Sequence, residues 1–252
     1  MEVVKLYLKS LAIPYLPFHS DTLYGAILWA FAKLGYNIEE VKNFKVSSAF
    51  PFYKDVYYFP NVVGKEGFLN LENFENLING REVGNVGYCN YGFTIVDIPH
   101  PTVDRITANT HLKYISGIKF DNNAGLYFLY DGDVDLKPAL RLLSDFGIGK
   151  CMDKGFGQFK FEFDTIDLNL PKSDVYINLS LVLPNNPKNL IKWDFVKRVK
   201  KQYNIRFLMV KEGSLMHYDD GKLINLKDLL LDDVYINGRS FLLPFKFKEG
   251  EL

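Results

Sequence analysis

The sequence is poor in the features that would assign it at once to a known class of protein. It has two cysteines in 252 residues, and Cys89 and Cys151 lie far apart without the C-x-x-C spacing of a zinc or redox site. We therefore expect two free thiols, no disulfide framework and no metal site. No run of about eighteen apolar residues is present, which argues against a membrane-spanning helix.

The amino terminus also lacks the pattern of a secretory signal. The stretch MEVVKLYLKSLAIP alternates like a β-strand and shows no charged region followed by an apolar core and a small-residue cleavage site. A cytoplasmic protein is therefore expected.

Net charge is the third feature that is missing. Thirty Lys and Arg residues balance thirty Asp and Glu residues, so the whole molecule projects no strong field toward nucleic acid. Any RNA site must then be a local patch. One basic segment, 188–201, is interpreted as the solvated face of an amphipathic helix, with a binding surface as the alternative. Its cations, set against the single carboxylate of Asp194, are Lys188, Lys192, Lys197, Arg198, Lys200 and Lys201.

Hydrophobic periodicity predicts an α+β fold. The first 168 residues read as strand, helix, strand, strand, helix, strand, which is the split βαβ order of a ferredoxin-like domain. Ser20 or Asp21 is available to cap the first helix, and Gly147 is expected to stop the second. The main segments behind this prediction are 4–14, 21–34, 111–120, 126–130, 136–146 and 156–163.

The pattern restarts after residue 168. VYINLSLVLP alternates strictly and is followed by a helix-like stretch, by the strand-like RFLMV and by an expected Asn-Gly hairpin turn at Asn237 and Gly238. We predict tandem ferredoxin-like (RRM-like) domains with antiparallel sheets and a Gly-rich loop after the second helix. Residues 1–168 would form the N-terminal domain with inserted hairpins, and residues 169–252 a smaller C-terminal one.

The loop DFGIGKCMDKGFGQF carries four closely spaced glycines. It runs from helix to strand, the wrong direction for a dinucleotide fingerprint, and it lacks the Gly-Lys-Ser/Thr ending of a P-loop. Gly147, Gly149, Gly155 and Gly157 leave backbone amides uncovered and permit positive φ, so they favour an anion-binding nest. The alternative is a helix stop followed by a tight turn.

Part of this loop also agrees at five positions with the RNA-binding signature of RRM domains. KGFGQFKF departs from that signature at Gln158 and Phe159, and it follows the helix where the RRM signature precedes one. Base stacking by Phe156 or Phe161 is therefore not assigned from this pattern, which favours core positions for both.

Three motifs together resemble a known group. FHSDTLYGAI at 18–27, PTVDRIT at 101–107 and GIGKCMDKGFGQF at 147–159 are similar to the RAMP superfamily of CRISPR proteins. More narrowly they resemble the family of the fourth subunit of the type III-A Csm effector complex, which holds the 5′ handle of the crRNA.

The resemblance implies a site, partners and no cofactor. The expected partners are crRNA, through its 5′ handle, the large polymerase-like subunit and the repeated backbone RAMP subunit. Arg105 and Thr107 would lie on a protruding hairpin and contact RNA there. The remaining expected RNA contacts come from the start of the first helix, through His19, Ser20 and Thr22, and from the glycine loop, through Gly147, Gly149, Lys150, Lys154, Gly155, Phe156 and Gly157.

Two other functions stay open at this stage. Some RAMP relatives are metal-independent endoribonucleases that process CRISPR repeat RNA, and such chemistry needs two proton-transfer groups at one phosphate. Asp21 is a further candidate, although capping is the commoner role at a helix start. The available histidines are His19, His100, His111 and His217, and their spacing brings no pair together. A mononucleotide-binding ferredoxin-like protein is the other alternative. The sequence assigns no role to the insertion at 61–92, and we expect no catalytic residue.

Overall fold

The main sheet contains three of the four strands predicted for the first 168 residues, and the fourth, at 111–120, lies in a separate sheet. A computed structural model describes residues 1–13, 15–84, 89–200, 204–227 and 234–246. Its seven-stranded antiparallel sheet has the order β10-β1-β9-β4-β5-β6, with β3 also paired to β9. The strands are β1 (Glu2–Leu8), β3 (Lys45–Val46), β4 (Phe50–Tyr53), β5 (Val56–Pro60), β6 (Phe68–Asn70), β9 (Ala124–Asp131) and β10 (Phe159–Thr165).

Two helices cover one face of this sheet, and both were predicted. Helices α1 (Ser20–Lys33) and α4 (Lys137–Phe146) bury their apolar stripes in one core with residues of β1 and β9. Pro138 lies in the first turn of α4 and Gly147 ends it, as expected. Two short helices, α2 (Ile38–Val41) and α3 (Leu71–Ile78), are also present.

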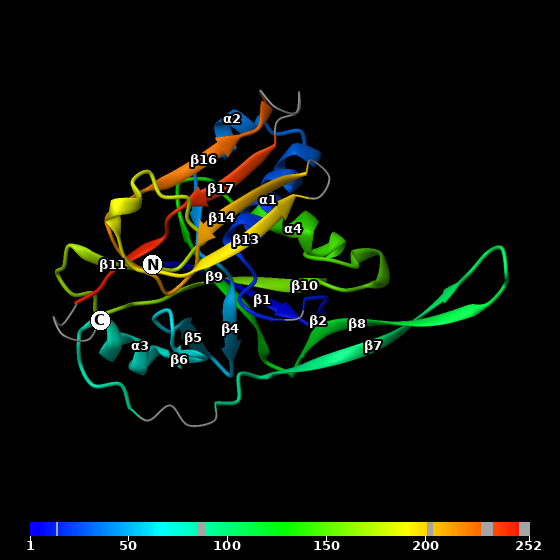
Figure 1. Cartoon of the computed structure of the whole chain (residues 1–252), viewed down its shortest axis with the longest axis horizontal. Coiled ribbons are helices and arrows are strands. Elements are labelled where there is room, and N and C mark those ends of the chain that lie inside the picture. The colour runs from blue at the N-terminus through cyan, green and yellow to red at the C-terminus, as the bar shows by residue number, and fades with distance from the viewer. Residues whose placement is uncertain (14, 85–88, 201–203, 228–233, 247–252) are drawn as a thin grey trace.

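A long hairpin leaves the body of the molecule. Strands β7 (Phe93–Val103) and β8 (Thr110–Phe120) pair along their whole length, and β2 (Ser10–Leu11) joins the base of β8. Figure 1 shows this hairpin extending well beyond the other elements. The strand predicted at 111–120 is confirmed.

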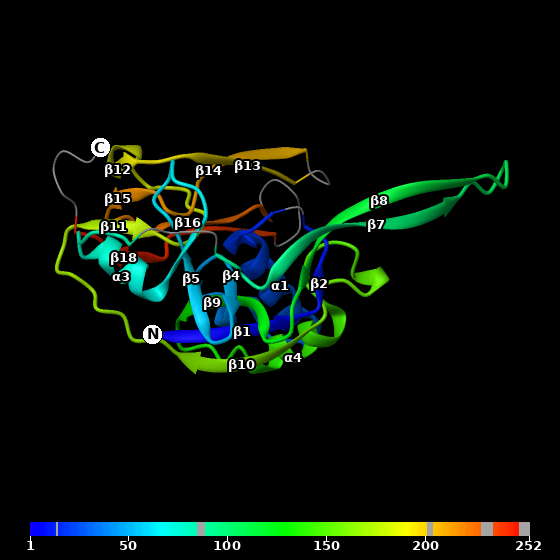
Figure 2. The ribbon, with the colours of Figure 1, turned by 90° about the horizontal axis from the view of Figure 1, so that it is seen from below.

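The second half of the chain packs on the opposite face of the main sheet. A second core joins Val3 and Tyr127 of that sheet to Ile177, Leu215 and Leu243. In Figure 2 the second sheet lies above β1 and β10. Its order is β12-β15-β11-β18, made of β11 (Val175–Asn178), β12 (Leu190–Lys192), β15 (Leu215–His217) and β18 (Leu242–Pro244).

Two hairpin ribbons complete this half. One pairs β13 (Phe195–Lys200) with β14 (Ile205–Val210), and the other pairs β16 (Gly221–Asn225) with β17 (Tyr235–Arg239). The strand predicted at RFLMV is therefore confirmed as β14.

The prediction of an amphipathic helix at 188–201 was wrong. Its described part, residues 188–200, forms a short 3-10 turn, Pro187–Asn189, followed by β12 and β13, and Lys201 lies outside the described residues. The branched and aromatic side chains of Phe195, Val196 and Val199 suit a paired strand. Lys197 and Arg198 are consecutive in β13 and therefore lie on opposite faces of the strand.

The prediction of a hairpin turn at Asn237 and Gly238 was also wrong. Both residues lie inside β17, opposite Leu223 and Lys222. A Cβ on Gly238 would lie 2.7 Å from Cβ of Leu183, so this glycine permits close approach of another chain segment and makes no turn.

Both cysteines are free, as predicted. None of the helices within the described ranges is long and apolar enough to cross a membrane.

Candidate nucleic-acid interface

A cavity of about 210 Å³ lies where the start of α1 meets the glycine loop. It brings together His19 and Thr22 from one predicted motif with Gly149 and Lys150 from another, more than a hundred positions away in the chain. These four residues were all predicted to contact RNA. The other lining residues are Ile13, Tyr15, Pro17, Phe18 and Arg198.

Arg198, from β13, also lines this cavity, although the sequence placed it only in the basic segment at 188–201 and not with the start of α1. Its Nε donates to Oδ2 of Asp21 at 3.0 Å, and its Nη2 donates to Oδ1 of Asp21 at 2.9 Å and to Oγ1 of Thr22 at 2.6 Å. Among the described residues no acceptor takes a hydrogen bond from Nη1. A guanidinium held on one edge in this way can still offer its other edge to a phosphate.

The start of α1 is not capped in the predicted manner. His19 is the N-cap residue and makes no side-chain cap, while Oγ of Ser20 accepts a hydrogen bond from the backbone amide of Leu181. The carboxylate of Asp21 accepts a hydrogen bond from Arg198, and the backbone amide of Ser20 donates to Oγ of Ser48. The capping prediction for Ser20 and Asp21 was therefore wrong, because the second half of the chain supplies these side chains with other partners.

The side chain of His19 is hydrogen-bonded to a buried carboxylate. Its Nδ1 lies 2.8 Å from Oε1 of Glu212, both side chains are buried, and the hydroxyl of Ser48 donates to the same oxygen. Burial opposes the charge on Glu212, but His19 and these hydrogen bonds outweigh it and keep the pKa of the carboxyl below its ordinary value. Oε2 of Glu212 is buried and has no partner within the described part of the chain.

All four glycines of the loop have positive φ, as their spacing suggested. The angles are +89° at Gly147 and Gly149, +81° at Gly155 and +77° at Gly157. Packing requires glycine at the first and last of these positions. A Cβ on Gly147 would lie 2.8 Å from the carbonyl oxygen of Phe156, and a Cβ on Gly157 would lie 1.9 Å from that of Ile148. Gly155 faces open space.

Some backbone amides of the loop donate hydrogen bonds within the protein and others do not. Gly147 donates to Leu143, Gly157 donates to Ser10, and Phe156 donates to Cys151. Gly155 and Lys154 also donate within the loop. By contrast, the amides of residues 149–151 donate to no acceptor in the ranges that the structure describes. Gly149 and Lys150 line the cavity, so the part of the loop suited to an anion is narrower than the full glycine motif.

The other predicted RNA contacts lie elsewhere. Arg105 and Thr107 are exposed in the turn at the tip of the β7–β8 hairpin, where the amide of Thr107 donates to Asp104. Figure 1 shows this tip far from α1. Lys154 is exposed on the outer turn of the glycine loop, and Phe156 is buried. Ser20 is fully buried against the second half of the chain.

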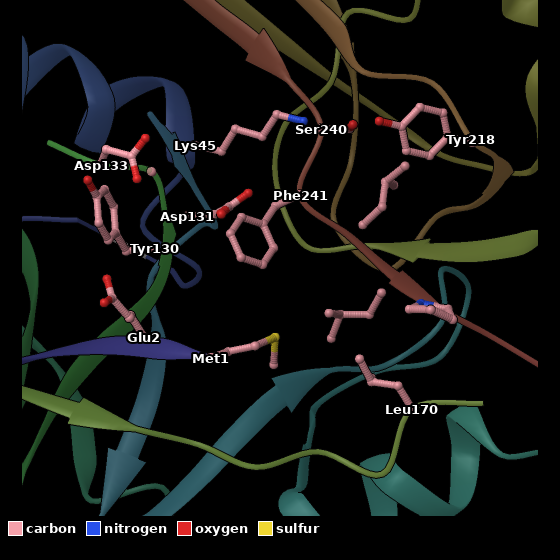
Figure 3. A pocket seen from close by; sticks show the side chains of 14 residues that line it. Met1, Glu2, Lys45, Tyr130, Asp131, Asp133, Leu170, Tyr218, Ser240 and Phe241 are labelled. Carbon is pink, nitrogen blue, oxygen red and sulfur yellow. The ribbon is translucent and has the colours of Figure 1, made fainter. Parts of the chain in front are cut away.

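A wider cavity, of about 720 Å³, lies between the two halves of the molecule. Figure 3 shows Glu2, Asp131 and Asp133 along it, with Lys45 beside Asp131, its partner in the β3–β9 pair. Lys45 is already paired with Asp220, at 2.8 Å. A phosphate would meet uncompensated carboxylates there, so the smaller, cationic cavity is the better nucleic-acid site.

The sequence carried a signal for Arg198 but none for Glu212. Arg198 belongs to the basic segment that was read as one helical face, and only its pairing in β13 turns it toward α1. Glu212 and Ser48 are single polar residues in loops, and no spacing relates either to His19. In the described part of the chain no group of three or more His, Cys, Asp and Glu residues could hold a metal ion.

Comparisons with known proteins bear on this site. No family model matches the chain. A curated protein of Thermococcus onnurineus (strain NA1), described as CRISPR system Cms protein Csm4, is 30% identical over 283 aligned residues, covering 94% of this chain and 96% of that protein.

Solved structures of complexes that contain Csm4 include chains similar in fold to this one. A chain of a Csm1–Csm4 cassette in complex with cA4 is 26% identical, with a TM-score of 0.76 and 99% of both chains covered. A chain of a Csm3–Csm4 subcomplex from a type III-A CRISPR-Cas interference complex is 18% identical, with a TM-score of 0.72 and coverage of 98% and 100%, and shows the same fold.

Proposed function

The chain belongs to the Csm4 family, and from this premise we propose that it is the subunit of a type III-A CRISPR effector complex that holds the 5′ handle of the crRNA. The observation that carries the proposal is the cavity between α1 and the glycine loop. It combines the cations of Lys150 and Arg198 with His19 and with Gly149 and Lys150 of the loop, whose backbone amides donate to no acceptor among the described residues. Fixed cations and free amides at one point are what a phosphate of a nucleic-acid strand requires.

The partners follow from the relatives. One related structure contains Csm1 and another contains Csm3. The chain would therefore dock the large polymerase-like subunit and the repeated backbone subunit, in addition to crRNA. Because such a complex is loaded with an RNA transcribed in the cell, its expected location is the cytoplasm.

The architecture behind this role is proposed as two related domains. The observed strand order β10-β1-β9-β4, with α1 and α4 on one face, supports a ferredoxin-like domain in residues 1–168. A smaller ferredoxin-like domain in residues 169–252 is proposed from the restart of the pattern, and the hairpin tip with Arg105 and Thr107 would reach a more distant part of the RNA.

We propose that the chain holds RNA and does not cleave it. Asp21 is buried and forms a bidentate pair with Arg198, and His19 shares its Nδ1 with Glu212. These partners support a structural role for Asp21 and a binding role, without proton transfer, for His19. Incubation with labelled repeat RNA, with and without magnesium, tests the alternative: specific cleavage that His19→Ala or Asp21→Ala abolishes would establish an endoribonuclease.

Salt dependence of RNA binding tests the handle site. The probe is a synthetic RNA with the 5′ handle of the CRISPR repeat, and the variant is Lys150→Ala with Lys154→Ala. Loss of two phosphate contacts should weaken binding. It should also reduce the magnitude of the slope of log K against log salt concentration by about 1.4. The matched control is Lys160→Ala with Lys222→Ala, which removes two exposed cations from β10 and β16 and should leave the slope unchanged.

Two results would contradict the proposal. An unchanged slope in the Lys150 and Lys154 variant would mean that this loop does not hold the handle. Tight binding of free ATP, competing with the RNA, would indicate a mononucleotide-binding protein.

A further inference from the structure

The cavity between α1 and the glycine loop has a lining of two chemical kinds. Cations and backbone amides suited to a phosphate come from the glycine loop and β13, whereas the segment between β2 and α1 supplies apolar groups. The apolar lining residues are Ile13, Tyr15, Pro17 and Phe18. We infer that this cavity takes one unpaired nucleotide of the RNA and that the ring of Tyr15 stacks on its base. The inference rests on the proposed function, because it concerns the same cavity.

Tyr15 is the aromatic ring of this cavity that a ligand can reach. It is 64% exposed, whereas Phe18 is buried in the core with α1. Two other exposed tyrosines, Tyr36 and Tyr218, each pack against a second ring. Within the described part of the chain, Tyr15 forms no such aromatic pair, and its hydroxyl has no hydrogen-bond partner. Both faces of this ring are therefore not engaged by another aromatic side chain.

The groups that would hold the adjoining phosphate are also unengaged. Lys150 forms no ion pair with any described residue, and the amides of Gly149 and Lys150 donate to no acceptor there. A nucleotide has a base with apolar faces and a charged phosphate, so it matches a lining that is partly apolar and partly cationic. Aromatic side chains commonly stack on the splayed bases of single-stranded RNA in this way.

The size of the cavity limits what it can hold. Its volume of about 210 Å³ is below the range of roughly 300 to 1,000 Å³ that is usual for small-molecule sites. One nucleotide of a longer strand therefore suits it better than a dinucleotide cofactor. Stacking uses the face of a base and not its hydrogen-bonding edge, so the identity of the base should have little influence on affinity.

Removal of the ring tests the inference. The full chain is titrated with the synthetic handle RNA, and Tyr15→Ala should lower its affinity by about 5- to 150-fold. The slope of log K against log salt concentration should not change, because no charge is lost. Tyr15→Phe keeps the stacking ring and should bind as the wild-type chain does. The matched control is Tyr218→Ala, which removes an exposed ring beside the acidic cavity and should leave affinity unchanged.

Handle RNAs that each lack one base locate the stacked nucleotide. For the wild-type chain, loss of the base at one position should lower affinity by a factor similar to that of Tyr15→Ala. The Tyr15→Ala chain should bind that abasic RNA no more weakly than the intact handle, because the ring and the base contribute only together. The fluorescence of 2-aminopurine at this position should be quenched by the wild-type and Tyr15→Phe chains but not by Tyr15→Ala. Circular dichroism of each variant confirms that it is folded.

The results also distinguish this inference from the proposed function. Wild-type affinity in Tyr15→Ala, or a loss in Tyr15→Phe as large as that in Tyr15→Ala, overturns the inference. So does an abasic scan of Tyr15→Ala that matches the wild-type scan at every position. In these cases a reduced salt slope in the Lys150 and Lys154 variant would leave the handle site standing. If neither the Tyr15 variants nor the Lys150 and Lys154 variant changes RNA binding, the cavity is not the handle site and both fail.

Discussion

Arg198 is the side chain through which the second half of the chain reaches the start of α1, and its removal offers the sharpest test of the site's construction. The side chain of Asp21 is 2% exposed and that of Arg198 is 26% exposed. In Arg198→Ala the carboxylate of Asp21 loses both guanidinium hydrogen bonds and keeps only the hydroxyl of Thr22, at 3.2 Å.

The expected loss of stability can be bracketed. Breaking a fully buried ion pair by removing one partner costs about 3 to 5 kcal/mol. Here water reaches the arginine, and the start of α1 stabilises a nearby negative charge by about 0.3 to 1 kcal/mol. We therefore expect Arg198→Ala to lower the free energy of unfolding by about 2 to 3 kcal/mol, measured by equilibrium unfolding in urea.

A double-mutant cycle supplies the control. Asp21→Asn removes the buried charge, so Arg198→Ala should cost less in that background, and the coupling free energy should be about 1 to 3 kcal/mol. Arg198→Lys keeps the charge but cannot form the bidentate pair, and should recover only part of the loss. If Arg198→Ala changes the free energy by less than about 0.5 kcal/mol, or if the two substitutions are additive, the ion pair does not stabilise this junction.

The remaining predictions concern the glycine loop and acid stability. Gly157→Ala places a Cβ 1.9 Å from the carbonyl oxygen of Ile148 and should cost on the order of 4 kcal/mol, whereas Gly155→Ala meets open space and should cost about 1 kcal/mol. Comparable effects in urea unfolding would show that packing does not separate the two glycines. Hydrogen bonds from Lys5 and Tyr57 lower the pKa of Asp164 from 3.8 to about 2. Because a group with a lowered folded-state pKa stabilises the fold above its unfolded pKa, this contribution should be complete above about pH 4 and disappear toward pH 2. Asp164 is 39% exposed, so the contribution is about 1 kcal/mol, and acid unfolding of Asp164→Asn against wild type would reveal it.

Much of the framework could be read from local patterns. Helices α1 and α4 and strand β9 follow from apolar periodicity, because each buries a continuous stripe or face against the same core. The positive φ angles of the glycine loop follow from residue type, since only glycine adopts that conformation freely at four neighbouring positions.

The errors share a physical origin. The basic segment at 188–201 and the Asn-Gly pair at 237–238 were interpreted from their own composition, but their structure is set by partners elsewhere in the chain. Strand β13 is fixed by β14, and Gly238 is placed by its contact with Leu183. Local propensity is weak where cross-strand pairing decides the outcome.

By itself, the sequence determined the order of the main elements, the turn-forming glycines and the two motifs that end at one cavity. Only the tertiary structure decided that Arg198 lines that cavity and that Glu212 contacts His19, because both residues arrive from segments whose positions depend on packing between the two halves. It also decided which loop amides remain free, since hydrogen bonds to Leu143 and Ser10 occupy those at Gly147 and Gly157. Residue spacing encodes periodicity along a chain, whereas charge pairing across a cavity depends on distances that only the folded chain sets.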